Sequence, residues 1–289
     1  MNRMALRALA LLLLLSGWGV TAEEPAQLQV APAPPVIAII IDDMGHQLQA
    51  GNEALELPGA ITYAFLPHTP HAHEMAEQAH ATGKEVMLHL PMDAHGGQEL
   101  GPGGLSLHMT QRQFQDALAS GLASVPHVAG LNNHMGSLLT RHPGAMDWLM
   151  QDVRQRGNLF FVDSRTSSLT VAEKLAREHQ VPTASRDIFL DNVRDPAYIR
   201  EQFRQLIRQA KSRGKAIGIG HPYPETIATL AEELEQLEAH GVKLVFTSEI
   251  IAAERAALPW QAALSPAPKE AKDLMPQPSS SCCEAPVAQ

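Results

Sequence analysis

Cysteine is nearly absent from this chain: only two residues occur among 289, and they are neighbours, Cys282 and Cys283. Two adjacent cysteines near the end of a chain form neither a disulfide framework nor a zinc knuckle. Both kinds of scaffold are therefore excluded. We expect free thiols on a C-terminal tail, with a vicinal bridge or an intermolecular disulfide as the alternatives.

Basic charge and aromatic side chains are also scarce. The net charge is −9, and no basic cluster occurs beyond the N-terminus. Nucleic-acid binding depends on concentrated Lys and Arg, so no nucleic-acid partner is expected. Neither GxGxxG nor GxxxxGK(S/T) follows the first apolar run, which argues against a dinucleotide or nucleotide site. Outside the N-terminal segment the tryptophans are Trp148 and Trp260, few for stacking on sugars.

The N-terminal segment predicts export from the cytoplasm. Arg3 and Arg7 precede a short apolar run, and small residues ending at Ala22 follow. These are the three regions of a cleaved signal peptide over residues 1–22, which would leave no stable membrane span; an uncleaved anchor is the alternative. Of the remainder, 23–35 is predicted to be a Pro/Ala-rich linker, 36–255 the folded domain and 256–289 a disordered tail.

One stretch organises the domain: six apolar residues, 36–41, run straight into Asp42, Asp43, Met44 and Gly45. A continuous apolar run of this length is typical of a strand buried on both faces of a parallel sheet. Such strands present functional residues at their carboxyl ends. Two adjacent carboxylates there would repel each other unless they share a cation or a proton. The alternative is that Asp42 caps a turn and Asp43 is solvated.

Strand and helix patterns alternate about eight times across residues 36–255, which predicts an α/β fold with a parallel sheet. Because polar residues follow so many strands, we expect a closed (β/α) barrel rather than an open, doubly wound sheet. Two capping boxes are predicted, at Thr110 and Thr170. The expected strands are 36–41, 61–66, 85–90, 127–131, 158–162, 181–185, 216–220 and 244–246, and the expected helices include 71–82, 143–157, 170–179, 196–213 and 224–240.

Polar side chains recur at the ends of the expected strands. A lone His in an apolar run is more often a hydrogen-bonded core residue, which is our interpretation of His127. Five strand ends that supply Asp, Asn or His together are harder to explain by chance, because in a barrel they meet on one face. These residues are Asp42 and Asp43, His89 and Asp93, Asn133 and His134, Asp163, and His221.

Fourteen histidines direct attention to metal or acid/base chemistry. An open zinc-type site needs two His and one carboxylate, and Asp43, His89 and His134 can supply that set. Asp42 could then act as general base, and His221 could protonate the leaving group. The combination suits metal-assisted hydrolysis of an amide or ester. Further residues are predicted only to line the cleft: Asp93, Asn133, Asp163, Ser164 and Asp191.

Five segments together resemble a known family, the divergent polysaccharide deacetylases, the YibQ-like branch of the NodB-homology superfamily. The resemblance runs from about Val36 to Ile251. The segments are Ile41-Asp42-Asp43-Met44-Gly45, Leu88-His89-Leu90-Pro91-Met92, Asn132-Asn133-His134-Met135-Gly136-Ser137, Phe161-Val162-Asp163-Ser164 and Ile217-Gly218-Ile219-Gly220-His221-Pro222.

The resemblance implies a distorted (β/α) barrel and metal-dependent removal of N- or O-acetyl groups from polysaccharides. Asp42 would be the base, Asp43 a metal ligand and His221 the general acid. Two departures stand out: Asp93 replaces the family's second metal-binding histidine, and Asn133-His134-Met135-Gly136 replaces its Arg-containing motif. We infer that His134 restores the missing ligand.

The sequence therefore predicts a periplasmic, metal-dependent hydrolase, with zinc as the expected ion, that removes acetyl groups from a cell-envelope polysaccharide through metal-activated water. A non-catalytic protein that binds glycan or a cell-envelope protein partner on the same fold is the alternative. A hydrolase of small molecules unrelated to glycans is a third interpretation.

Overall fold

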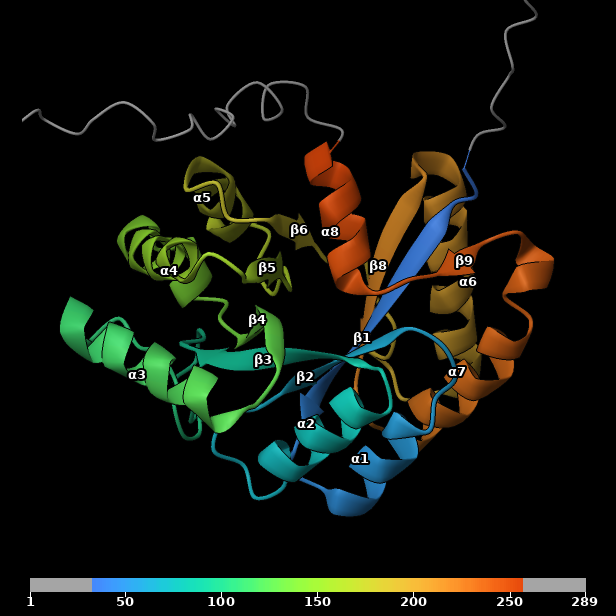
Figure 1. Cartoon of the computed structure of the whole chain (residues 1–289), viewed down its shortest axis with the longest axis horizontal. Helices are drawn as coiled ribbons and strands as arrows, with labels where there is room; N and C mark the ends of the chain where they lie inside the picture. The colour runs from blue at the N-terminus through green and yellow to red at the C-terminus, as the bar shows by residue number, and fades with distance from the viewer. Residues whose placement is uncertain (1–32, 257–289) are drawn as a thin grey trace, which may run out of the picture. The chain divides into compact units, whose positions relative to one another are not determined.

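A computed structural model describes residues 33–256, in which every strand pair is parallel. The sheet order is β6-β5-β4-β3-β2-β1-β8-β7, and β9 pairs with β1 (Figure 1). The strands are β1 (Val36–Met44), β2 (Ile61–Phe65), β3 (Glu85–Met92), β4 (Val128–Met135), β5 (Phe160–Asp163), β6 (Thr183–Ser185), β7 (Ile188–Phe189), β8 (Lys215–Gly220) and β9 (Lys243–Leu244). The helices are α1 (Leu48–Leu55), α2 (Ala72–Ala81), α3 (Gln111–Ser124), α4 (Pro143–Arg156), α5 (Ala172–Glu178), α6 (Pro196–Arg213), α7 (Pro224–Glu235) and α8 (Thr247–Ala256).

One extended segment, residues 183–189, joins the two edges of the curled sheet. Its first part is β6, which pairs with β5, and its last part is β7, which pairs with β8. Between them, Arg186 N donates to Asp163 O and Asp187 N donates to Ile217 O, each at 2.9 Å. Because the same segment bonds to both edges, the sheet forms a distorted barrel. The predicted fold class is confirmed.

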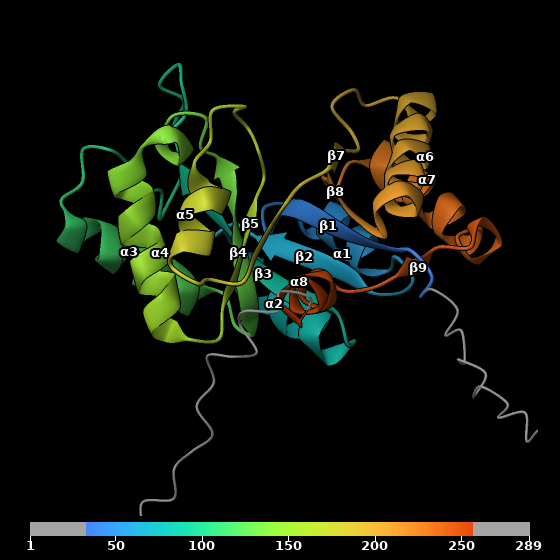
Figure 2. The ribbon, with the colours of Figure 1, turned by 90° about the horizontal axis from the view of Figure 1, so that it is seen from above.

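The two faces of the strands enclose two different cores. In β1, Ile37, Ile39 and Ile41 face the outer helices, while Ala38 and Ile40 point to the barrel interior. Figure 2 shows α3, α4 and α5 along one side of the sheet and α6 and α7 along the other. This explains why β1 is apolar at every position up to Asp42: both of its faces are covered.

Helix α8 closes the end of the barrel at which β2 and β3 begin. Its Ile250 and Ile251 join the interior core. Beside them, Thr247 N and the hydroxyl of Thr62 lie 3.3 Å apart, and Thr62 Oγ1 donates to Glu85 at 2.9 Å. The opposite end, where the strands finish, remains available for a site.

Several predicted boundaries are confirmed by their caps. Thr110 forms the expected capping box of α3, Asp195 caps α6, and α4 and α6 end at Gly157 and Gly214 with φ of 80° and 84°. These local signals depend on neighbouring residues only, so sequence predicts them well. One boundary differs: the strand expected over residues 158–162 begins two residues later, at Phe160.

Other boundaries were predicted wrongly. The capping box at Thr170 does not form: Val171 occupies the N-cap position, and the Thr170 hydroxyl accepts from Ala172 N at 3.2 Å while it donates to Asp163 Oδ2 at 2.8 Å. The Glu173 carboxylate, which would close the box, accepts from the Ser185 hydroxyl instead. The helix expected to reach 240 ends at Glu235 and tightens into a 3₁₀ turn, Glu238–His240, so that Leu237 is buried. Strand β3, expected to end at Leu90, continues through Pro91 to Met92. Pro91 has no N–H, but its carbonyl oxygen still accepts a hydrogen bond, from Leu105 N.

The predicted signal peptide (1–22) and nearly all of the predicted linker and tail, including Cys282 and Cys283, lie outside the described residues. Within residues 33–256, none of the helices has the length and hydrophobicity needed to cross a membrane.

Candidate functional site

The site begins with a bulge at the end of β1. Adjacent residues of a strand normally point to opposite faces. The pairing with β2 shifts between Ile41 and Met44, and Asp43 has a left-handed backbone with φ of 57°. The extra residue rotates Asp43 toward the same side as Asp42. Both carboxylates therefore face the carboxyl end of the barrel interior, and Asp42 is only 3% exposed.

Strands β3 and β4 supply the nitrogen atoms of the site. His89 follows Met87 by two residues, so both side chains point inward. In the register of the sheet His89 is paired with Asn132, and His89 Nδ1 lies 2.7 Å from Asn132 Oδ1. His134 follows Asn132 by two residues and lies on the same face. Because side chains alternate between the two faces of a strand, His89 and His134 both lie on the face that points to the barrel interior.

Asp43, His89 and His134 converge on one point. Asp43 Oδ1 lies 3.2 Å from His89 Nε2 and 2.9 Å from His134 Nδ1, and the two nitrogens are 3.1 Å apart. Among the described residues these three form the one group whose ligand atoms lie within 4.8 Å of one another. Asp43 Oδ1 is buried, and apart from the close approach of these two ring nitrogens it has no hydrogen-bond partner. Two imidazoles and such a carboxylate oxygen fit a divalent metal ion of the zinc type.

The charges in this group are strongly coupled. Burial raises the pKa of Asp42, and the opposing effects of His89, His221 and Asn132 do not cancel it. Burial would also raise the pKa of Asp43, but contacts with His134 and His89 outweigh it and hold that pKa well below its usual range. Burial disfavours charge on His89, yet Asp42 and Asp43 raise its pKa to about 9. The raised pKa favours a doubly protonated His89 ring near neutral pH, and a bound cation would displace one of its two ring protons.

His221 stands on the other side of Asp43, directly after β8. Its Nε2 lies 3.8 Å from Asp43 Oδ2, and its Nδ1 lies 3.0 Å from Asp191 Oδ1. Asp191 Oδ2 also accepts from His221 N at 2.6 Å and from Thr226 Oγ1 at 2.8 Å. Burial lowers the pKa of His221, but the hydrogen bond to Asp191 and its charge outweigh this and raise it. Such an imidazole can hold a proton for transfer.

A cavity of about 310 Å³ adjoins the three convergent residues. Asp43 and His134 form part of its wall, and Tyr223, whose ring stacks on His221 at 5.4 Å, forms another part. The loop after β1 completes it. That loop lies close to the start of α2: at Gly45, φ is 105°, and an added Cβ would sit 2.3 Å from Thr69 Oγ1 and 3.0 Å from Ala72 Cα, so only glycine fits.

The residues predicted only to line the cleft hold the surrounding loops. Asp93 Oδ2 accepts from Leu107 N at 2.8 Å, and Asp163 accepts from Arg165 N at 2.8 Å and from Thr170. Burial raises the pKa of Asp163.

Asn133 donates to Met135 O at 2.7 Å and accepts from Ser164 N at 2.9 Å. The Ser164 hydroxyl is buried without a partner. Asp191, predicted to line the cleft, lies buried beneath His221 instead of on the cavity wall.

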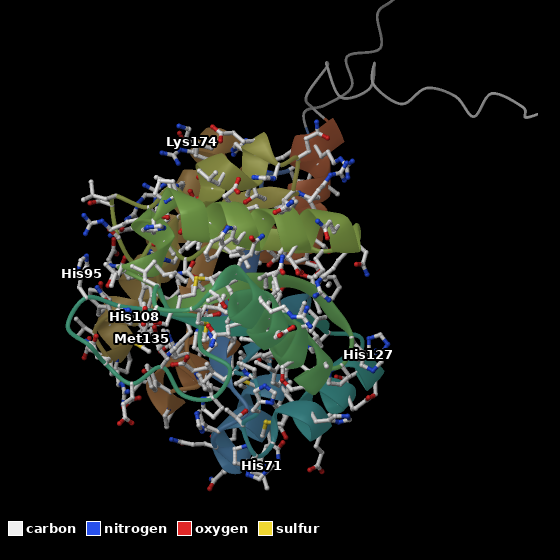
Figure 3. The ribbon with its side chains drawn as sticks, turned by 90° about the vertical axis from the view of Figure 1, so that its left-hand side faces the viewer. His71, His95, His108, His127, Met135 and Lys174 are labelled. Carbon is white, nitrogen blue, oxygen red and sulfur yellow. The ribbon has the colours of Figure 1, made fainter. Side chains whose placement is uncertain are left out.

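His127 lies away from this site. It precedes β4, its Nε2 is 2.8 Å from Glu77 Oε2, and its ring stacks on His80. In Figure 3 His95, His108 and Met135 lie toward one side of the molecule and His127 toward the other. Met135 ends β4, so His127 marks the opposite end of the barrel.

Sequence reasoning missed Asn132, which contacts both Asp42 and His89. The alternation of β4 could have found it. Asn132 lies two residues before His134 and so shares its face, whereas Asn133, which was predicted, has the other parity.

Known proteins resemble this chain in sequence and in fold. The pattern of the family described as divergent polysaccharide deacetylase matches residues 39–251. An uncharacterized Escherichia coli protein, YibQ, is 38% identical over 215 residues, which cover 74% of this chain and 67% of that protein. The crystal structure of an uncharacterized Agrobacterium tumefaciens protein has a TM-score of 0.73 at 24% identity, covering 76% of this chain and 91% of that one.

An enzyme structure shows the same fold at greater distance. The catalytic domain of a peptidoglycan N-acetylglucosamine deacetylase from Eubacterium rectale has a TM-score of 0.50 at 14% identity, covering 75% of this chain and 90% of that one. The match of the family pattern to most of the folded domain and the identity to YibQ are decisive: the chain belongs to the divergent polysaccharide deacetylase family.

Proposed function

We propose that the protein is a periplasmic, metal-dependent hydrolase that removes acetyl groups from a cell-envelope polysaccharide. The observation that carries the proposal is the convergence of three kinds of group at one end of the barrel. They are a carboxylate free to act as base, Asp42; a set of ligand atoms on Asp43, His89 and His134; and an imidazole on a buried carboxylate, His221 on Asp191.

Asp43, His89 and His134 would hold the ion, for which zinc is the best match, and a bound divalent ion supplies Lewis-acid polarisation of an acyl oxygen. His89 is ready for this role because its Nδ1 is engaged by Asn132 and its Nε2 faces Asp43. The cavity beside Asp43 and His134 gives the substrate acyl group access to the same point.

The chain's own residues account for the proton transfers. As the oxygen of water bonds to the acyl carbon, Asp42 accepts a proton from that water; its raised pKa brings it closer to the range of an effective base. As the bond from the acyl carbon to the sugar nitrogen or oxygen breaks, protonated His221 donates to that leaving atom. The immediate products are acetic acid and a free amine or hydroxyl. The acid ionises to acetate by releasing its proton to solvent, and Asp42 loses the proton it accepted while His221 regains one, so atoms and charges balance over the cycle.

The substrate class rests on the family description, polysaccharide deacetylase. The periplasmic location rests on the predicted signal peptide. A non-catalytic glycan- or partner-binding protein is the competing proposal, and Asp93 favours it: the carboxylate that replaces the family's second histidine is engaged by Leu107 N at the loop.

Metal content and acetate release decide between these proposals. We expect about one zinc per chain in the purified protein, lost in Asp43→Ala and retained in Asp42→Asn. The wild type is then assayed for acetate released from acetylated glycans, and Asp42→Asn should retain zinc but lose this activity. Glu77→Gln, which alters only the contact with His127, is the matched control. Absence of zinc even after incubation with divalent ions would favour the binding protein.

A further inference from the structure

Asn132 is completely buried between two residues of the site. Its Nδ2 lies 2.8 Å from Asp42 Oδ1, and its Oδ1 lies 2.7 Å from His89 Nδ1. It therefore joins the carboxylate assigned as base to an imidazole assigned as metal ligand. A single side chain of β4 touches β1 and β3 at once.

Chemistry fixes which way the amide points. A carboxylate only accepts hydrogen bonds, so the side facing Asp42 must be the NH₂ group. The carbonyl oxygen then faces His89, and since a carbonyl cannot donate, the proton of that bond must be on His89 Nδ1. The reversed amide would place its carbonyl oxygen against the carboxylate with no proton between them. The observed orientation is thus the one that satisfies both neighbours.

This orientation selects one tautomer of His89. With a proton held on Nδ1, the lone pair of the neutral ring is on Nε2, which lies 3.2 Å from Asp43 Oδ1 and 3.1 Å from His134 Nδ1. Nε2 is therefore the atom that faces the other two ligand atoms. A hydrogen bond on the distal nitrogen is the usual means by which proteins orient a metal-binding imidazole.

We propose that Asn132 is a positioning residue with two functions: it holds Asp42 in place through its NH₂ group, and it sets the metal-binding tautomer of His89 through its carbonyl. The first function, here the base half, rests on the proposed function of the protein. The second, the ligand half, depends only on metal binding. The two halves use different atoms of one side chain, so they are separable by substitution.

Two variants separate them. Asn132→Ala removes both contacts, and zinc affinity and the rate of acetate release should each fall by about 10–100-fold. Asn132→Asp keeps an oxygen acceptor for His89 Nδ1 but places a second carboxyl group against Asp42. The two carboxyl groups must share a proton, so Asp42 is no longer free to accept one from water. This variant should retain zinc affinity within about threefold of the wild type while activity falls by about 10–100-fold. Affinities are measured by competition with a chromophoric chelator.

A control and a metal-independent measurement complete the test. Thr62→Val removes a buried polar group at the other end of the barrel, so it should lower the melting temperature without changing zinc affinity. In metal-free protein, at a pH where the His89 ring is neutral, ¹⁵N NMR should show the ring proton on Nδ1 in the wild type and a mixture of tautomers in Asn132→Ala.

Each result has a defined meaning. Unchanged zinc affinity in Asn132→Ala, equal affinity losses in the Ala and Asp variants, or a wild-type proton on Nε2 would overturn the ligand half. Full activity of Asn132→Asp would overturn the base half. If the wild type binds zinc but releases no acetate from any glycan, the proposed function and the base half fail, and the ligand half still stands or falls on affinity and tautomer.

Discussion

Replacing Asp191 by Asn tests the charge beneath His221. Asp191 accepts three hydrogen bonds, from His221 N, Thr226 Oγ1 and the His221 ring. The amide oxygen of Asn can accept the first two, so the fold should be retained. Only the ring contact loses its negative charge. A hydrogen bond to a charged group contributes about 1.5–3 kcal/mol, which corresponds to a fall in kcat of roughly 10–150-fold.

The pH dependence gives the sign of the effect. A general acid works while it is protonated, so activity is present below the pKa of His221 and is lost as pH rises through it. Asp191 raises that pKa, and its removal should therefore move the alkaline decline of kcat to lower pH. The same displacement should appear when the His221 ring is titrated by NMR, a measurement that needs no substrate.

A matched variant separates charge from packing. Thr226→Val removes one donor to Asp191 but leaves the carboxylate in place, so the alkaline decline should stay where it is. If Asp191→Asn left both the NMR midpoint of His221 and the alkaline decline unchanged, Asp191 would have no electrostatic role, and the assignment of His221 as an acid would lose its support.

Three further predictions concern metal, packing and pH. His134→Ala should lower zinc affinity by at least about tenfold without unfolding the chain; unchanged zinc content would remove His134 from the ligands. Gly130→Ala should cost about 1–3 kcal/mol in thermal unfolding, because its Cβ would lie 2.4 Å from the Phe160 ring, whereas Gly121→Ala in α3, with neighbours at 3.6 Å, should be neutral or stabilising. Since the pKa of His89 is raised from 6.5 to about 9, its contribution to the stability of metal-free protein should be complete below pH 6.5 and lost as pH rises through 9. A His89→Gln variant in chelator-treated samples should therefore show a smaller fall in melting temperature between pH 6 and 9.5 than the wild type, and an equal fall would contradict this.

The general arrangement of the site followed from periodicity, and its details did not. Apolar runs that end in Asp42, His89 and His221 predict parallel strands whose carboxyl ends meet, and the barrel confirms that fold. The approach of Asp43 to the same side depends on a bulge with φ of 57°, which no local pattern indicates.

Partnerships between distant segments were equally hidden. Asp191 reaches His221 over 30 residues of sequence and Asn132 reaches Asp42 over 90, so only the folded sheet reveals them. The wrong capping box at Thr170 has a related origin: the Glu173 carboxylate, which was expected to close it, accepts from the Ser185 hydroxyl of β6 instead. The roles given to the site residues stay predictions until they are measured.

The segment 183–189 has a mechanical consequence. The segment links β5 to β8 through the pairing of β6 and β7, and Asp191 follows its last residue by two positions. Because Asp191 follows this segment by two residues, a displacement of the segment would also displace the carboxylate that contacts the His221 ring. The bonds that close the barrel therefore also fix the distance between Asp191 and His221.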